Sequence, residues 1–203
     1  MLKGDVNMNV TVPNGKVGTV SLTGTLAHPL TLSGAWNVLG IKTMTTTFTN
    51  FFNCTIDATS IGTLQAGGNL TGTSSITAWA AGSIKVLGDL ASTSTYAIDI
   101  TALSTTSKIE IAGTGTYGAG AGFTYNRIRV GTLNGQILIG TGAKVLNGMF
   151  GCVYVTDSLS TGKLKADAAN PDGWLYADNP NNLTYTVGTT TGKAVGMLFG
   201  HSG

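Results

Sequence analysis

Apolar and polar residues alternate along much of the chain, and the alternating segments recur. The stretch "IGTLQAGGNLTGTSSITAWAAGSIKVLGDL", residues 61–90, contains nearly the same phrase twice. An apolar, polar, apolar triplet followed by small residues begins about every 19 to 25 residues, as expected for strands with one buried face. The triplets are Val20-Ser21-Leu22, Ile41-Lys42-Thr43, Leu64-Gln65-Ala66, Ile84-Lys85-Val86, Ile109-Glu110-Ile111 and Ile128-Arg129-Val130, with Leu164-Lys165-Ala166 as a later candidate.

A second series of strands lies between these triplets. Ile56, Ile76 and Ile98 repeat at steps of 20 and 22 residues. No segment has the 3.6-residue apolar spacing that one helix per repeat would need. Self-similarity at this period indicates a solenoid, because one repeat buries its apolar side only when the next one stacks on it.

The pattern predicts an all-β fold, a right-handed parallel β-helix with coils of about 19–25 residues stacked roughly 4.8 Å apart. We expect a single domain over residues 1–203, with regular coils at about 15–131 and irregular coils and a cap at about 132–203. The segment "DAANPDGWLYADNPNN", with two prolines and Trp174, is predicted to be a long loop or an irregular cap.

The triplets also predict a register. The middle residues should form one outward column, in which Glu110 lies between Lys85 and Arg129. That outward column is Ser21, Lys42, Gln65, Lys85, Glu110 and Arg129. The inward columns are Val20, Ile41, Leu64, Ile84, Ile109, Ile128 and Leu22, Thr43, Ala66, Val86, Ile111, Val130.

Composition narrows the functional classes. Charged residues are only 10% of the chain, hydrophobic residues 42%, and the net charge is +2, so a folded chain without a basic surface for nucleic acid is expected. The chain contains no run of 18 apolar residues, so we expect no membrane span, and "MLKGDVNMNV" lacks the apolar core of a signal peptide.

The two cysteines, Cys54 and Cys152, do not have the spacing of a metal site. Two buried thiols are expected, with a disulfide as the alternative.

The segments "IGTLQAGGNLTGT", "AGSIKVLGDL" and "NRIRVGTLNGQILIGTGA" resemble the degenerate Gly/Thr-rich β-helix repeats of large secreted bacterial surface proteins of the planctomycete type. They are also similar to the passenger β-helices of adhesins. The resemblance covers roughly residues 15 to 165. It implies an extracellular or cell-surface β-helix and carries over no catalytic residue.

Two carboxylates share a position in the second strand series. Asp57 and Asp99 lie two coils apart with Thr77 between them, near the upper separation of about 9.5 Å used in glycoside hydrolysis, and Trp79 could be a sugar platform. The simpler interpretation is two solvated acids, because no arginine, histidine or further acid is expected in the adjacent coil. Arg127 and Arg129 have no expected partner beyond Glu110.

Other motifs do not form sites. His28 and His201 have no companions at metal-ligand or catalytic spacing, and "GAGAG" at residues 118–122 lacks the end of a phosphate-binding loop. We therefore expect no catalytic, cofactor or metal site. Thr-x-Thr pairs recur once per coil and resemble ice-binding ladders, although polar turns whose hydroxyls bond the backbone are the favoured explanation. The pairs are Thr23/Thr25, Thr45/Thr47, Thr71/Thr73, Thr93/Thr95 and Thr114/Thr116.

The function expected from the sequence is a non-catalytic structural or adhesive extracellular module, part of a bacterial surface or extracellular assembly. The expected partners are copies of the chain itself, in an oligomer, filament or lattice, or surface glycans. The alternatives are a carbohydrate-active β-helix and, less favoured, an ice-binding solenoid. The apolar tail at Val195, Met197, Leu198 and Phe199 is expected to close an edge against the last coils or a neighbouring subunit.

Overall fold

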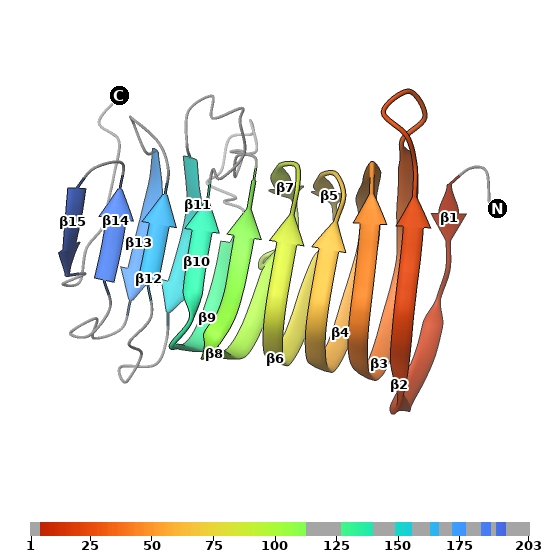
Figure 1. Ribbon diagram of the computed structural model, residues 1–203, viewed down its shortest axis with the longest axis horizontal. Helices are drawn as coiled ribbons and strands as arrows, with labels where there is room; N and C mark the ends of the chain where they lie inside the picture. The colour runs from red at the N-terminus through yellow and green to blue at the C-terminus, as the bar shows by residue number, and fades with distance from the viewer. Residues whose placement is uncertain are drawn as a thin grey trace.

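Strands stack side by side along one axis, from β1 at one end to β15 at the other (Figure 1). This computed structural model describes residues 5–112, 127–139, 149–155, 163–166, 172–177, 184–187 and 190–193, with side chains for residues 5–112 and 128–138. The paired strands are parallel except for the last pair, β14 and β15. The predicted parallel β-helix is confirmed. In the described part of the chain, no helix is long and apolar enough to cross a membrane.

Long strands dominate the first half of the chain because each one bends and continues from one face of the coil to the next. They are β2 (Val10–Thr23), β3 (Leu30–Thr47), β4 (Thr49–Ala66), β6 (Ser75–Val86) and β8 (Ile98–Ile111). The short strands are β1 (Val6–Asn7), β5 (Leu70–Gly72) and β7 (Leu90–Ser92). The later strands are β9 (Arg127–Leu133), β10 (Gln136–Ile139), β11 (Met149–Val155), β12 (Lys163–Ala166), β13 (Asp172–Ala177), β14 (Thr184–Val187) and β15 (Thr190–Lys193).

Three ladders of stacked residues run along the axis. The first ladder contains the predicted Ile56, Ile76 and Ile98 column, and the second contains most of the triplets. Members of the first ladder, in register, are Trp36, Ile56, Ile76, Ile98, Ile128, Val153 and Leu175. Members of the second are Val20, Met44, Leu64, Ile84, Ile109, Ile137, Leu164 and Tyr185. Members of the third are Val6, Leu32, Phe51, Leu70 and Leu90.

The inward side chains of these ladders form one core. Alternate residues of each strand point inward, so apolar side chains from successive coils contact one another and are withdrawn from water. Leu64, Ile84 and Ile109 are fully buried within it. The predicted inward stack of these three residues is therefore confirmed.

The predicted register is wrong at both ends of the triplet series. Ile41 lies at the bend and pairs with Ile61, and Met44 takes its place beside Leu64. Ile128 pairs with Ile98 in the first ladder, and the neighbour of Ile109 is Ile137. In the second inward column Thr43 and Val130 are likewise misplaced: Leu22 pairs with Thr46, Val130 with Ile100, and Ile111 with Ile139.

The outward column changes in the same way. Thr45, not Lys42, stacks between Ser21 and Gln65, while Leu138, not Arg129, follows Glu110. Gln65, Lys85 and Glu110 keep their predicted order. The Glu110 carboxylate contacts Lys85 Nζ at 2.9 Å, as predicted, and its second cation is Lys108 at 3.2 Å, in place of Arg129.

The segment expected to be a long loop or an irregular cap, residues 167–182, is not a continuous loop: it contains β13, which pairs in parallel with β11. The physical reason is hydrogen bonding of the backbone. An extended segment stacked on the previous coil pairs its N–H and C=O groups with that coil, which a loop does not do. The apolar tail at residues 195–199 lies outside the described residues.

Left-handed backbone recurs at the same turn in three successive coils. Gly34 has φ 108°, Asn53 φ 51° and Gly72 φ 61°. Glycine and asparagine are the residues that adopt this conformation at least cost, so they mark the turn between the third and first ladders.

A row of side-chain oxygens at the other end of the third ladder, just before Phe51 and Leu70, joins successive coils. Asn50 Oδ1 accepts from Asn69 N at 2.9 Å, and Asn69 Oδ1 accepts from Asp89 N at 2.7 Å. These three residues form what we call the asparagine ladder. It satisfies backbone donors that the regular sheet pairing leaves free at this point of the coil.

Candidate functional site

A row of polar side chains follows the outer surface of the first ladder. Each member lies between two buried residues of its strand, as Asp57 lies between Ile56 and Ala58, so the pleat directs it away from the core. The row is Asn37, Asp57, Thr77, Asp99 and Arg129, in register on consecutive coils. The prediction that Asp57 and Asp99 share one column with Thr77 between them is therefore confirmed.

Asp99 is paired with an arginine of the next coil. Arg129 Nε donates to Asp99 Oδ1 at 2.8 Å, and Arg129 Nη2 donates to Asp99 Oδ2. The Arg129 guanidinium also lies over the Tyr96 ring, 4.2 Å from its centroid. The hydrogen bond to Asp99 raises the pKa of Arg129 above its ordinary value. Both oxygens of Asp99 are thus held by a two-point contact that fixes the carboxylate's orientation.

This pair corrects the sequence interpretation of the site. Asp99 was expected to have no arginine in the adjacent coil, and Arg129 was expected to face Glu110. The triplet Ile128-Arg129-Val130 instead stacks on Ile98-Asp99-Ile100. The opposite charges of Asp99 and Arg129 are the signal that could have found this alignment, because directly opposed charges on neighbouring strands favour pairing.

An exposed tryptophan lies one position further along the same face. Trp79 is 65% exposed, and its neighbours in the outward direction are Thr77 on its own strand and Thr101 on the next coil. Trp79 and the polar row surround a shallow depression of about 370 Å³. The depression is lined by Asp57, Ala58, Thr59, Thr77, Ala78, Trp79, Asp99, Thr101 and Arg129.

Asp57 differs from Asp99 in its surroundings. It is exposed, and no hydrogen bond or ion pair to it occurs among the residues whose side chains are described. The depression therefore contains one fixed ion pair and one carboxylate available to a ligand, with one net negative charge from Asp57, Asp99 and Arg129 together.

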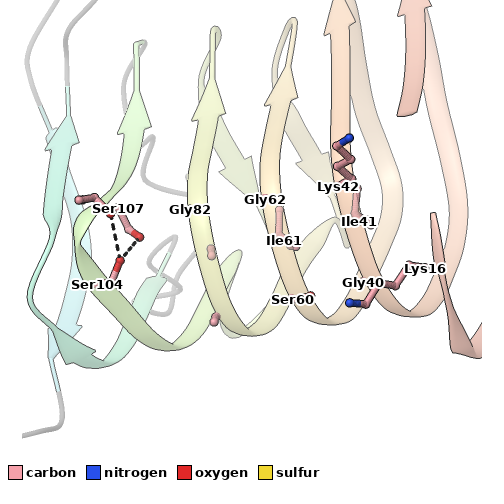
Figure 2. A pocket seen from close by; sticks show the side chains of 13 residues that line it. Lys16, Gly40, Ile41, Lys42, Ser60, Ile61, Gly62, Gly82, Ser104 and Ser107 are labelled. Atoms are coloured by element: carbon pink, nitrogen blue, oxygen red, sulfur yellow. Dashed lines mark hydrogen bonds between the residues drawn. The ribbon is translucent and has the colours of Figure 1, made fainter. Parts of the chain in front are cut away.

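A second, larger hollow of about 590 Å³ follows the bend between the first and second ladders (Figure 2). Small residues form its floor because the chain bends too tightly for larger ones: a Cβ on Gly82 would lie 2.6 Å from the Gly62 carbonyl oxygen. Lys16 and Lys42 lie toward one end, and Ser104 and Ser107 lie at the other, with their hydroxyl oxygens 2.7 Å apart (Figure 2). We assign this hollow to the geometry of the bend.

Two further candidates from the sequence, Cys54 and His28, lie apart from these surfaces. Cys54 is a buried free thiol that forms no disulfide, and burial raises its pKa to about 12. His28 lies in a turn closed by backbone hydrogen bonds with Thr25. Among the described residues, no group of three or more His, Cys, Asp or Glu side chains could hold a metal. The Cys152 side chain, His201 and residues 118–122 are outside the described set.

The Thr-x-Thr pairs do not form one ladder. Thr23 stacks on Thr47, whereas Thr45 stacks on Ser21 and Gln65. Thr71 lies in the third ladder's strands, between Phe52 and Ala91. Successive pairs are therefore offset from one another, and Thr114 and Thr116 lie outside the described residues.

The fold and this face define a parallel β-solenoid with a polar outer sheet and one projecting aromatic side chain. No protein-family model, curated protein or solved structure matches the chain.

Proposed function

We propose that the chain is a non-catalytic structural or adhesive β-solenoid module of an extracellular bacterial assembly. The observation that carries the proposal is the two-point contact between Arg129 and Asp99. It holds both oxygens of Asp99, which shares the row with Asp57 in the described part of the chain, and so leaves this carboxylate poorly placed for acid or base chemistry.

Hydrolysis of a glycosidic bond by the usual route requires two carboxyl groups with separate roles. One must give a proton to the leaving oxygen, which a carboxylate held on both oxygens by a guanidinium is poorly placed to do. Strands two coils apart are about 9.6 Å apart, near the upper limit for an inverting pair. Asp57 therefore stands without a partner for this chemistry among the described side chains.

The adhesive or structural role is supported by the shape of the molecule. A stack of coils presents a long sheet face whose side chains are placed by the core, which suits repeated weak contacts. In the described structure, β2 pairs only with β3, so its outer edge has backbone groups available to a further strand. Self-association through such an edge, or contact of the face with surface glycans, are the modes of assembly that we propose.

The test separates catalysis from assembly. The purified chain is incubated with neutral and acidic polysaccharides, and reducing ends and unsaturated products are measured; we expect none above background. Product release that disappears in Asp57→Ala would overturn the proposal in favour of a carbohydrate-active enzyme. In parallel, sedimentation velocity and electron microscopy measure assembly. A chain that stays monomeric and binds neither itself nor any polysaccharide would also contradict the proposed role.

A further inference from the structure

We infer that the depression beside Trp79 is a binding site for a neutral oligosaccharide of flat pyranose rings, such as a β-linked glucan or xylan. This inference rests on the adhesive part of the proposed function and names the ligand class and the residues that hold it. Its elements are an exposed aromatic surface, a carboxylate without a partner among the described side chains and a fixed ion pair, all on one sheet face.

Trp79 supplies the apolar half of the site. The residue is 65% exposed, although the strand around it alternates between buried residues and small polar ones such as Thr77. A large aromatic surface in water is favourable to cover, and its electron-rich face attracts the C–H bonds that line one side of a flat pyranose. The indole face is therefore better suited to pack against a sugar ring than against the small threonine side chains beside it.

The polar row supplies the other half. Asp57, Thr77 and Asp99 occupy consecutive coils beside Trp79, so their backbone positions are spaced by the strand separation of about 4.8 Å. Sugar hydroxyls lie around the edge of the ring and donate to the side-chain oxygens of this row. Because Arg129 holds Asp99, that carboxylate needs little ordering when a ligand arrives.

The charge of the site selects a neutral ligand. Asp57 has no cation among the described side chains, and the Arg129 charge is offset by Asp99. An acidic sugar would place a second carboxylate near Asp57 without compensation, whereas a neutral hydroxyl can donate a charge-assisted hydrogen bond to it. The volume of about 370 Å³ is at the small end of ligand pockets, which are typically about 300–1,000 Å³, so one or two rings fill it.

The experiment titrates the whole chain with cellohexaose, xylohexaose and an oligogalacturonate, measured by calorimetry and by tryptophan fluorescence. Trp36 is 3% exposed and contributes little to a ligand-induced change. The difference from Trp79→Phe isolates the Trp79 signal. We expect a neutral hexamer to bind and shift Trp79 emission. Trp79→Ala should weaken binding at least about 10-fold, and Asp57→Asn about 3- to 10-fold.

Phe52→Ala is the matched control, because Phe52 is an exposed aromatic side chain outside the depression and its loss should leave affinity unchanged. Circular dichroism checks that each variant is folded. Binding of the oligogalacturonate alone, or binding that Trp79→Ala leaves unchanged, overturns the inference. If the wild type binds no sugar and Trp79→Ala loses self-association, the face binds a second copy of the chain, and the oligosaccharide inference is overturned. The proposed structural role is compatible with each of these results. Release of sugar products, in contrast, would overturn the proposed function itself.

Discussion

Arg129 lies directly beside Asp99 on the neighbouring coil and engages both of its carboxylate oxygens, although 30 residues separate the two in the chain. The contact joins β8 and β9 on neighbouring coils of the first ladder. It also determines the charge of the face that contains Trp79.

Removing either partner of this pair should destabilise the fold modestly. Arg129→Ala and Asp99→Ala should each cost about 0.5–1 kcal/mol, with a coupling energy of similar size, because the Arg129 side chain is 42% exposed and screened by solvent. Urea unfolding of the double-mutant cycle measures this. Arg129→Lys should recover only part of it, since lysine lacks the two-point geometry. Asp57→Ala is the control and should stay within about 0.5 kcal/mol; a coupling of zero would contradict the expectation.

The in-and-out register of β6 predicts opposite outcomes at adjacent residues. Ile84 is fully buried, so Ile84→Ala should reduce the free energy of unfolding by about 2–5 kcal/mol. Lys85 is on the outer face in a partly exposed ion pair with Glu110, so Lys85→Ala should cost less than about 1 kcal/mol. Chemical denaturation compares the two. Similar losses at both positions would show that the register of β6 is misassigned.

The asparagine ladder should contribute through its acceptor oxygens. Asn69→Ala leaves the backbone N–H of Asp89 without the Asn69 acceptor and should cost about 1–2 kcal/mol. Asn69→Asp retains an acceptor oxygen but places a second negative charge near Asp89. The stability lost in this variant should therefore be smaller at acidic pH, where both carboxylates are protonated. Thermal unfolding at two pH values tests this. Asn37→Ala, on the exposed outer row, is the matched control and should have little effect; an equal loss there would refute a special role for the ladder.

The buried thiol of Cys54 should make stability depend on pH in alkaline solution. Burial raises the pKa of Cys54 from 9.0 to about 12, so the unfolded chain releases this proton first. The free energy of unfolding should be unaffected below about pH 9 and should fall as pH rises toward about 12, by at most about 1.4 kcal/mol per pH unit. Denaturation of the wild type and Cys54→Ala at about pH 8 and about pH 10.5 isolates the effect. A constant difference between them would contradict it.

Much of the fold follows from alternation and period alone. The column of Ile56, Ile76 and Ile98 and the stack of Leu64, Ile84 and Ile109 were both predictable, because each coil must place an apolar residue over the last one. The errors have a physical cause. The first and second ladders use the same apolar, polar, apolar triplet, so the triplet alone does not identify the ladder to which it belongs.

Coil length decided where the prediction failed. Ile128 follows Ile109 by 19 residues, close to one period, yet its true neighbour is Ile98, 30 residues earlier. The extra residues between β8 and β9 shift the count. The same shift hid Arg129 from Asp99, so the site was predicted as two carboxylates and its cation was assigned to Glu110. Charge complementarity, applied to both ladders, would have distinguished the two alignments.

The regular stacking of coils makes spacing on the outer face discrete. The backbone positions of one row are separated by whole multiples of about 4.8 Å, whatever side chains they carry. Loss of the coil that carries Thr77 would leave the core columns continuous but would place Asp57 next to Asp99, at about the 5–5.5 Å spacing of retaining glycosidases. Gain or loss of a single repeat can therefore change what such a surface recognises, or whether it reacts, without any change of residue in the site itself.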